Sequence, residues 1–194
     1  KQKTIDEVIG SLNDWTQRYY SAKKFGEHIR DKFEVGHREG YYRWDGLRYL
    51  LFEYEDHLRK KAKQNEAKLT WDEFTKKRKE HVTVEHIYPQ TETEDWAVLF
   101  EGLTAEQKRY LTHTLGNLVP LSRAKNSSLQ NFAFDTKKDN GKGGGYSYGS
   151  ISEIQISKKQ AWTAAHILER GLELLDFMER NWEVELGDRQ FKKE

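Results

Sequence analysis

Apolar residues recur at helical spacing in two long stretches of the sequence, and this pattern constrains the fold most. In residues 157–185, one helix face would carry Ala161, Ala164, Leu168, Leu172, Leu175 and Trp182. In residues 45–64, the inner face would carry Leu47, Leu51, Tyr54 and Leu58. Side chains three or four positions apart lie on one side of a helix, so both stretches are predicted to be helices. The fold class is therefore expected to be mainly α.

Capping-box patterns indicate where further helices begin. In this pattern a Ser or Thr is followed three residues later by Glu or Gln, and the two side chains bond to each other's backbone N–H groups. Four occurrences that precede such apolar patterns start at Thr4, Thr70, Thr104 and Ser157. Each occurrence precedes apolar residues at helical spacing, which favours a helix after each one.

Composition excludes several classes of protein. The 194 residues include no cysteine, which excludes a disulfide scaffold, a Cys-ligated zinc site and a thiol nucleophile. No apolar run reaches the length that a membrane span needs, and the start of the chain lacks the apolar segment of a signal peptide. Because the sequence begins without Met, we expect it to be part of a longer protein.

Charge is unevenly distributed, although the formal net charge is only +1. Residues 58–80 carry a net charge of +5 and residues 120–143 a net charge of +3. Residues 91–107 and 168–188 each carry −5. The total argues against a histone-like binder, whereas the segregation is compatible with a basic face that contacts phosphates. The alternative is that each run is a solvated helix face.

A Glu–His pair follows the first of two short predicted strands, at residues 81–84 and 118–121. At a strand end, Glu85 and His86 can point into one cleft. A carboxylate is a hard oxygen ligand suited to Mg²⁺ or Mn²⁺. A histidine titrates near neutral pH and can take a proton from water. The alternative is that His86 is purely structural.

Two asparagines accompany the second predicted strand. Gly116 and Asn117 form a turn signal ahead of it. Ser122 can cap a helix that carries Asn126 in its early part. The order along the chain is therefore strand, Glu–His, excursion, turn with Asn, strand, and helix with Asn.

This order resembles the HNH (His-Me finger) family of nucleases, whose core is a β-hairpin and a helix around one metal ion. The residues at the family's motif positions are Glu85, His86, Asn117 and Asn126. The chain also resembles, over about residues 45–185, the C-terminal nuclease domain of the GmrSD family of modification-dependent restriction and phage-defence proteins. That likeness rests on residues 85–90 and 115–118 and on Asn126, Leu129, Asn131, Phe132, Lys137, Trp162, Ile167, Arg170, Leu174 and Trp182.

The resemblance implies a metal-dependent DNA endonuclease. His86 would be the general base, and Asn117 would hold the hairpin and so orient His86. Glu85 and Asn126 would hold one Mg²⁺ (or Mn²⁺). Residues expected to contact DNA phosphates are Arg123, Lys125 and Lys137. The alternatives are a catalytically inactive HNH-like DNA-binding module and, less favoured, an RNase.

The expected architecture is one domain over residues 1–194, an HNH-type ββα-metal core embedded in a helical domain. Its parts would be an N-terminal helical part (1–80), the core (81–135) with a helical insertion (91–114), a Gly-rich loop region (136–156) and the C-terminal helix (157–185). The resemblance implies a bacterial, cytoplasmic effector domain. Its expected partners are phage or modified DNA and an N-terminal nucleotide-hydrolysing sensor domain of the same protein.

Three further features are interpreted more simply. The Gly-rich residues 139–150 are expected to form a mobile loop. The basic run at residues 76–79 could deliver the DNA backbone to the site, or could be a solvated helix end. Five histidines without motif context are expected to be structural, namely His28, His37, His57, His113 and His166.

Overall fold

The computed structural model describes residues 9, 24–29, 39–64, 83–141, 143–184 and 186. Some expectations lie outside these residues: the capping patterns at Thr4 and Thr70, the start of the first strand, the basic run at 76–79, and His37. Within the described residues, no helix is long and apolar enough to cross a membrane.

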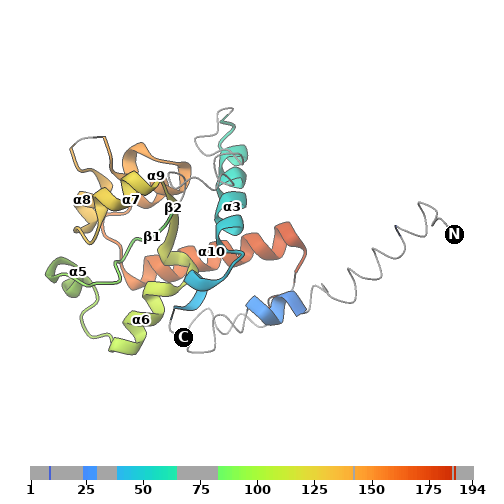
Figure 1. Ribbon diagram of the computed structural model, residues 1–194, viewed down its shortest axis with the longest axis horizontal. Helices are drawn as coiled ribbons and strands as arrows, with labels where there is room; N and C mark the ends of the chain where they lie inside the picture. The colour runs from blue at the N-terminus through green and yellow to red at the C-terminus, as the bar shows by residue number, and fades with distance from the viewer. Residues whose placement is uncertain are drawn as a thin grey trace.

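Helices dominate the structure and enclose one small sheet, which confirms the expected fold class (Figure 1). In chain order the named elements, with η for a 3-10 helix, are η1 (Gly40–Arg43), α3 (Leu47–Lys61), β1 (Thr83–His86), α5 (Glu94–Leu99), α6 (Ala105–His113), η2 (Leu115–Asn117), β2 (Leu118–Leu121), α7 (Arg123–Leu129), α8 (Phe134–Lys138), η3 (Tyr146–Tyr148), α9 (Ile151–Ser157) and α10 (Ala164–Trp182).

The sheet is an antiparallel hairpin of β1 and β2, in which Glu85 pairs with Val119 and His86 with Leu118. The β2 prediction is confirmed at both ends. Strand β1 continues through Glu85 and His86 instead of ending at residue 84. Two helices, α5 and α6, lie in the excursion between the strands, and α7 follows β2 and packs on β1.

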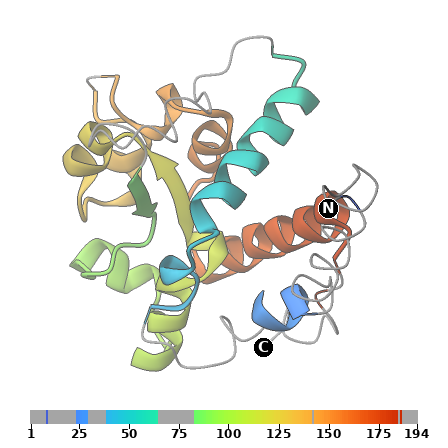
Figure 2. The same cartoon turned by 45° about the vertical axis from the view of Figure 1, so that its right-hand side comes forward.

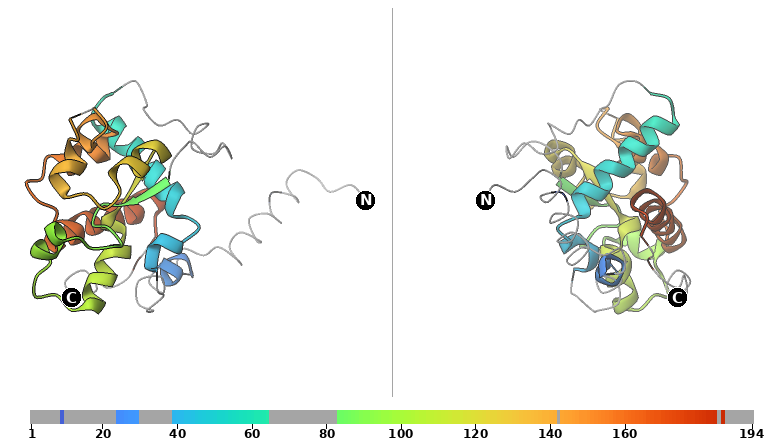
Figure 3. Two further views of the ribbon diagram at one scale, coloured as in Figure 1. Left: turned by 60° about the vertical axis from the view of Figure 1, so that its left-hand side comes forward. Right: turned by 90° about the vertical axis from the view of Figure 1, so that its right-hand side faces the viewer.

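Helices surround the hairpin on both sides. Helices α7 and α8 lie on one side, and α3 with α10 lies on the other (Figure 2). Figure 3 shows the same arrangement from two further directions. All four residues predicted for the inner face of α3 are buried, so this face is confirmed, and two apolar clusters fill the interior.

The last helix differs from its prediction in both start and face. It begins at Ala164, because Thr163 and His166 form its capping box, whereas Ser157 ends α9. The buried residues are Ile167, Arg170, Gly171, Leu174, Phe177 and Met178, and the predicted inner residue Leu168 is 40% exposed. The face is rotated because α10 packs against η2 through small residues and an arginine.

Close approach of backbones explains this rotation. A Cβ atom on Gly116 in η2 would lie 1.8 Å from the carbonyl oxygen of Ile167 and 2.7 Å from the nitrogen of Gly171. From α10, Arg170 Nη1 donates to the carbonyl oxygens of Gly116 and Leu118, each at 2.8 Å. Polar and small residues therefore face the hairpin, and apolar spacing alone did not indicate them.

Two predicted helix starts are confirmed. Thr104 and Gln107 form a capping box at α6, and the Ser122 side chain accepts from the Lys125 backbone at α7. The Gly-rich region contains the short helix η3 (Tyr146–Tyr148), and Tyr146 in it is completely buried.

Candidate active site

Glu85 and His86 point to opposite faces of β1, contrary to the expectation of one shared cleft. Both residues lie inside the strand and pair with β2. Successive side chains of a strand alternate between its faces. Glu85 therefore shares a face with Thr83, next to α7 and α8, whereas His86 faces η1 and α6.

On the first face, the Glu85 carboxylate lies in a buried polar cluster. Its Oε1 accepts from Lys137 Nζ at 2.6 Å and from the Tyr146 hydroxyl at 3.4 Å. Burial raises the pKa of Glu85 and lowers the pKa of Lys137, and the attraction between the two charges opposes both shifts. Through Lys137 and Tyr146, the Glu85 carboxylate therefore links β1 to α8 and to the Gly-rich region.

Lys137 is not placed as a surface contact for a DNA phosphate, so this part of the prediction is corrected. The side chain is 0% exposed. Its ammonium donates to Glu85 and also to the carbonyl oxygens of His86 and Ile87, each at 3.1 Å. Because an ammonium has three donor positions, all of them are used inside the protein.

On the second face, the His86 ring is held by three side chains. Its Nε2 lies 3.2 Å from His113 Nδ1, and its Nδ1 lies 3.2 Å from Gln90 Nε2. The Tyr42 ring stands against it at a centroid distance of 4.4 Å. Burial, helped by His113 and Lys137, lowers the pKa of His86 from 6.5 to about 3. The ring is therefore neutral at neutral pH.

Asn117 is completely buried where η2 meets β2. Its amide nitrogen donates to the carbonyl oxygens of Tyr88 at 2.8 Å and Thr112 at 2.9 Å. Its Oδ1 accepts from the Tyr88 backbone at 2.8 Å and from the Trp162 indole at 3.2 Å. Four bonds from one side chain fix the segment that leaves β1 directly after His86.

Asn126 bonds back to β1 from α7. Its Nδ2 donates to Thr83 Oγ1 at 2.7 Å and to the Val84 carbonyl oxygen at 3.5 Å. Because Thr83 and Glu85 share a face of β1, Asn126 and Glu85 lie on the same side of the hairpin. The ββα unit thus unites the two residues expected to hold a metal ion.

The oxygen atoms on this side are of the type that a hard cation prefers, and the Lys137 ammonium already compensates the charge of the Glu85 carboxylate. One of them belongs to the Glu85 carboxylate, whose Oε1 accepts the hydrogen bonds from Lys137 and Tyr146. The other is the amide oxygen of Asn126, whose amide nitrogen donates to Thr83. Mg²⁺ prefers such oxygen ligands and keeps several waters. Among the described residues, no three His, Asp or Glu side chains form a metal-binding group. Water would therefore have to fill several positions.

The other two residues that are expected to contact DNA phosphates, Arg123 and Lys125, lie on α7 and differ in their surroundings. Arg123 is exposed at the start of the helix. The Lys125 side chain is 15% exposed and forms an ion pair with Glu153 of α9. Arg123 is therefore the more accessible of the two for a phosphate.

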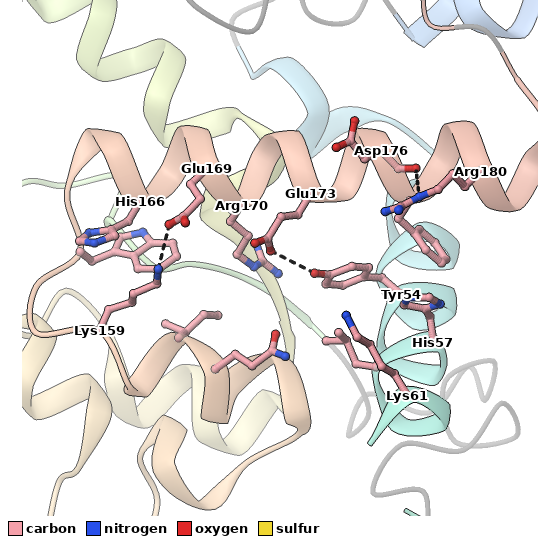
Figure 4. Close-up of a pocket in the computed structure, with 15 residues that line it drawn as sticks. Tyr54, His57, Lys61, Lys159, His166, Glu169, Arg170, Glu173, Asp176 and Arg180 are labelled. Carbon is pink, nitrogen blue, oxygen red and sulfur yellow. Dashed lines mark hydrogen bonds and ion pairs between the residues drawn. The ribbon is translucent and has the colours of Figure 1, made fainter. Parts of the chain in front are cut away.

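A separate pocket of about 330 Å³ lies between α3, α9 and α10 (Figure 4). Tyr54 donates to Glu173 at 3.3 Å across it, and Lys159 pairs with Glu169 at 2.8 Å. None of the predicted site residues is among its lining residues. Trp162 is the connection to the candidate site, because it lines the pocket and also donates to Asn117.

The structure adds residues that sequence reasoning missed. His113 has no motif context in the sequence, yet its ring lies against His86. Tyr42 also contacts the His86 ring. Gln90 lies in the motif at residues 85–90, and the structure places its amide against the His86 ring. His113 lies four positions before Asn117, and this proximity was the available signal. No signal in the sequence marked Tyr42.

Taken together, the elements define a mainly helical domain built on a ββα unit, with a buried histidine at the end of β1. Comparison with protein families matches residues 27–177 to GmrSD restriction endonucleases, C-terminal domain. The match covers well over half of the chain, so the chain belongs to this family and is a nuclease domain of the restriction-endonuclease type. No curated protein and no solved structure matches the chain.

Proposed function

We propose that the domain is a metal-dependent DNA endonuclease of the HNH type, with His86 as its general base. The observation that carries this proposal is the ββα unit, in which β1 ends at His86 and Asn126 of α7 bonds back to the same strand. Family membership supports a nuclease that acts on DNA.

In this mechanism, His86 accepts a proton from the water that attacks the phosphorus. Its low pKa keeps it unprotonated at neutral pH. The ring is 5% exposed, so the water can reach it only after part of its cover moves. Gln90 is the side chain that would have to leave, because it occupies Nδ1. Asn117 keeps the backbone after His86 in place during this rearrangement.

Glu85 and Asn126 would hold one Mg²⁺ or Mn²⁺ on the other face of β1. When bound, the ion supplies positive charge that stabilises the phosphoryl oxygens and the leaving group. Because the ligands and the base lie on opposite faces, the scissile phosphate would cross the end of β1. Arg123 and Lys125 of α7 would contact neighbouring phosphates there.

The proposed context is bacterial defence in the cytoplasm. As in the family resemblance, the domain would be the effector of a restriction or anti-phage protein. A nucleotide-hydrolysing sensor domain in the N-terminal part of the full-length protein would control it. The expected target is phage or modified DNA.

The test is cleavage of supercoiled plasmid and of single-stranded RNA, with Mg²⁺, Mn²⁺ or a chelator. We expect metal-dependent nicking of the plasmid, a loss of roughly tenfold or more for Asn126→Ala, and unchanged activity for His28→Ala, a change at an exposed site. Cleavage of RNA alone would identify an RNase. DNA binding without cleavage under every metal condition would identify an inactive HNH-like module.

A further inference from the structure

Both ring nitrogens of His86 have a partner, and these partners determine where its proton lies. Gln90 approaches Nδ1 with its amide nitrogen, at 3.2 Å. An amide nitrogen can only donate a hydrogen bond. With the amide in this orientation, Nδ1 of His86 accepts, and in the neutral ring the proton is on Nε2.

The proton on Nε2 points at a second histidine. His86 Nε2 lies 3.2 Å from His113 Nδ1. Because Nε2 is the donor, His113 Nδ1 is the acceptor, and a neutral His113 carries its own proton on Nε2. The three side chains thus form a one-way chain of hydrogen bonds from Gln90 through His86 to His113.

Packing holds His113 in position for this contact. It is the last residue of α6, two positions before η2 begins and four positions before the Asn117 anchor. The backbone of Gly40 packs so closely that a Cβ atom there would lie 3.1 Å from the His113 carbonyl oxygen. The rings of His86 and His113 meet edge to face, at a centroid distance of 5.1 Å.

We propose that His113 is a positioning residue for the general base, because it accepts from His86 Nε2 and so leaves Nδ1 as the basic nitrogen. The inference rests on the proposed function, in which His86 activates water. His113 touches neither substrate nor metal in this scheme. Its effect is to select one tautomer and one orientation of the ring that reacts.

A matched pair of substitutions isolates the hydrogen bond. In His113→Asn, the amide oxygen takes nearly the place of the ring Nδ1 and can still accept. In His113→Leu, a side chain of similar size cannot accept. His28→Ala, at an exposed site, serves as the control for loss of a histidine.

Two measurements are made on the full 194-residue chain. Two-bond ¹H–¹⁵N correlations of the His86 ring report its tautomer in the absence of DNA. Plasmid cleavage at increasing DNA concentration separates kcat from KM. Because Gln90 also favours the Nε2–H tautomer, the tautomers are compared in a Gln90→Ala background. There we expect the Nε2–H tautomer with His113 and with His113→Asn, and a lower population of it with His113→Leu. We also expect kcat of His113→Leu to fall roughly 10- to 100-fold, with KM unchanged.

Each outcome decides a different statement. If His113→Leu does not lower the Nε2–H population in the Gln90→Ala background, or keeps the wild-type kcat, the positioning role is overturned while the nuclease assignment stands. If His113→Asn loses as much as His113→Leu, the hydrogen bond is not the cause and the inference fails. If wild type cleaves no DNA but the tautomer responds as expected, the contact is supported and the proposed function fails.

Discussion

At the scale of single residues, the Glu85–Lys137 pair has the largest expected effect on stability. Both side chains are nearly or completely buried, at 7% and 0% exposure. Removing one partner of such a pair leaves the other charge buried without compensation, which costs about 3–5 kcal/mol. We expect Lys137→Met to lower the free energy of unfolding by this amount in urea titrations.

Two controls accompany this prediction. Lys159→Met breaks the more exposed pair with Glu169 and should cost less than about 1 kcal/mol. The double substitution of Glu85→Gln with Lys137→Met should recover part of the loss, because no unpaired charge remains. A loss for Lys137→Met as small as that for Lys159→Met would contradict the buried pair.

His86 should make stability depend on pH. Its pKa is about 3 in the folded protein and near 6.5 in the unfolded chain, because burial disfavours the charged ring. Below pH 6.5 the unfolded state therefore binds more protons, so stability falls as the pH is lowered toward 3. One such group contributes a slope of at most about 1.4 kcal/mol per pH unit.

Urea unfolding across this pH range checks the prediction. His113 has a pKa lowered mainly by burial, so it adds to the slope in the same direction. Replacement of His86 by Asn should reduce the dependence of stability on pH by up to about 1.4 kcal/mol per pH unit, the contribution of one proton. An unchanged slope in His86→Asn would show that His86 titrates alike in both states.

At the scale of secondary-structure elements, the contact between η2 and α10 determines how the hairpin is supported. A Cβ on Gly116 would lie 1.8 Å from the Ile167 carbonyl oxygen. On Gly171, across the same contact, a Cβ would have its nearest neighbour at 3.5 Å. The two glycines therefore differ in the room that they leave for a methyl group.

Gly116→Ala should destabilise the protein by about 3 kcal/mol, because the helix must move away from η2. Gly171→Ala should be neutral or stabilising by up to about 1 kcal/mol, because alanine favours the helix. Thermal or urea unfolding of both variants gives the comparison. Equal losses for both variants would contradict the proposed close contact.

Sequence patterns predicted the elements whose reasons are local. The inner face of α3, strand β2 and the caps at Thr104 and Ser122 all follow from neighbouring residues. The start and the face of α10 do not follow from neighbouring residues. Gly171 and Arg170 face the hairpin because they contact η2 and β2. Apolar periodicity cannot indicate a face made from a glycine and a hydrogen-bonded arginine.

The candidate site was predictable only in part. The motif indicated the residue types, and the structure brings Asn126 to β1 as the ββα order implies. The motif could not show that Lys137 is buried against Glu85, because that contact spans 52 positions. It also could not show that His113 lies against His86, because the contact depends on how α6 packs.

At the scale of the whole molecule, the expected basic face is weaker than the charge count indicates. In the basic region of residues 120–143, Lys125, Lys137 and Lys138 are paired with acidic side chains. Arg123 remains exposed beside the ββα unit. Each phosphate contact contributes about 0.9 to the slope of log K against log salt.

Binding measurements over a range of salt concentrations test the role of Arg123. Arg123→Ala should weaken DNA binding and reduce the slope by about 1. Arg180→Ala, at an exposed site near the end of α10, should leave the slope unchanged. A slope that falls equally in both variants would indicate a diffuse field rather than a contact at α7.

The central claim is that His86 activates water for phosphodiester cleavage in a domain that belongs to the GmrSD restriction endonuclease family. The most direct measurement compares initial rates of plasmid nicking by wild type and His86→Ala at saturating metal, with DNA binding measured alongside. A general base contributes typically 10²–10⁴-fold, so we predict a rate loss of about this size with DNA affinity retained. Equal rates for the two proteins would contradict the claim.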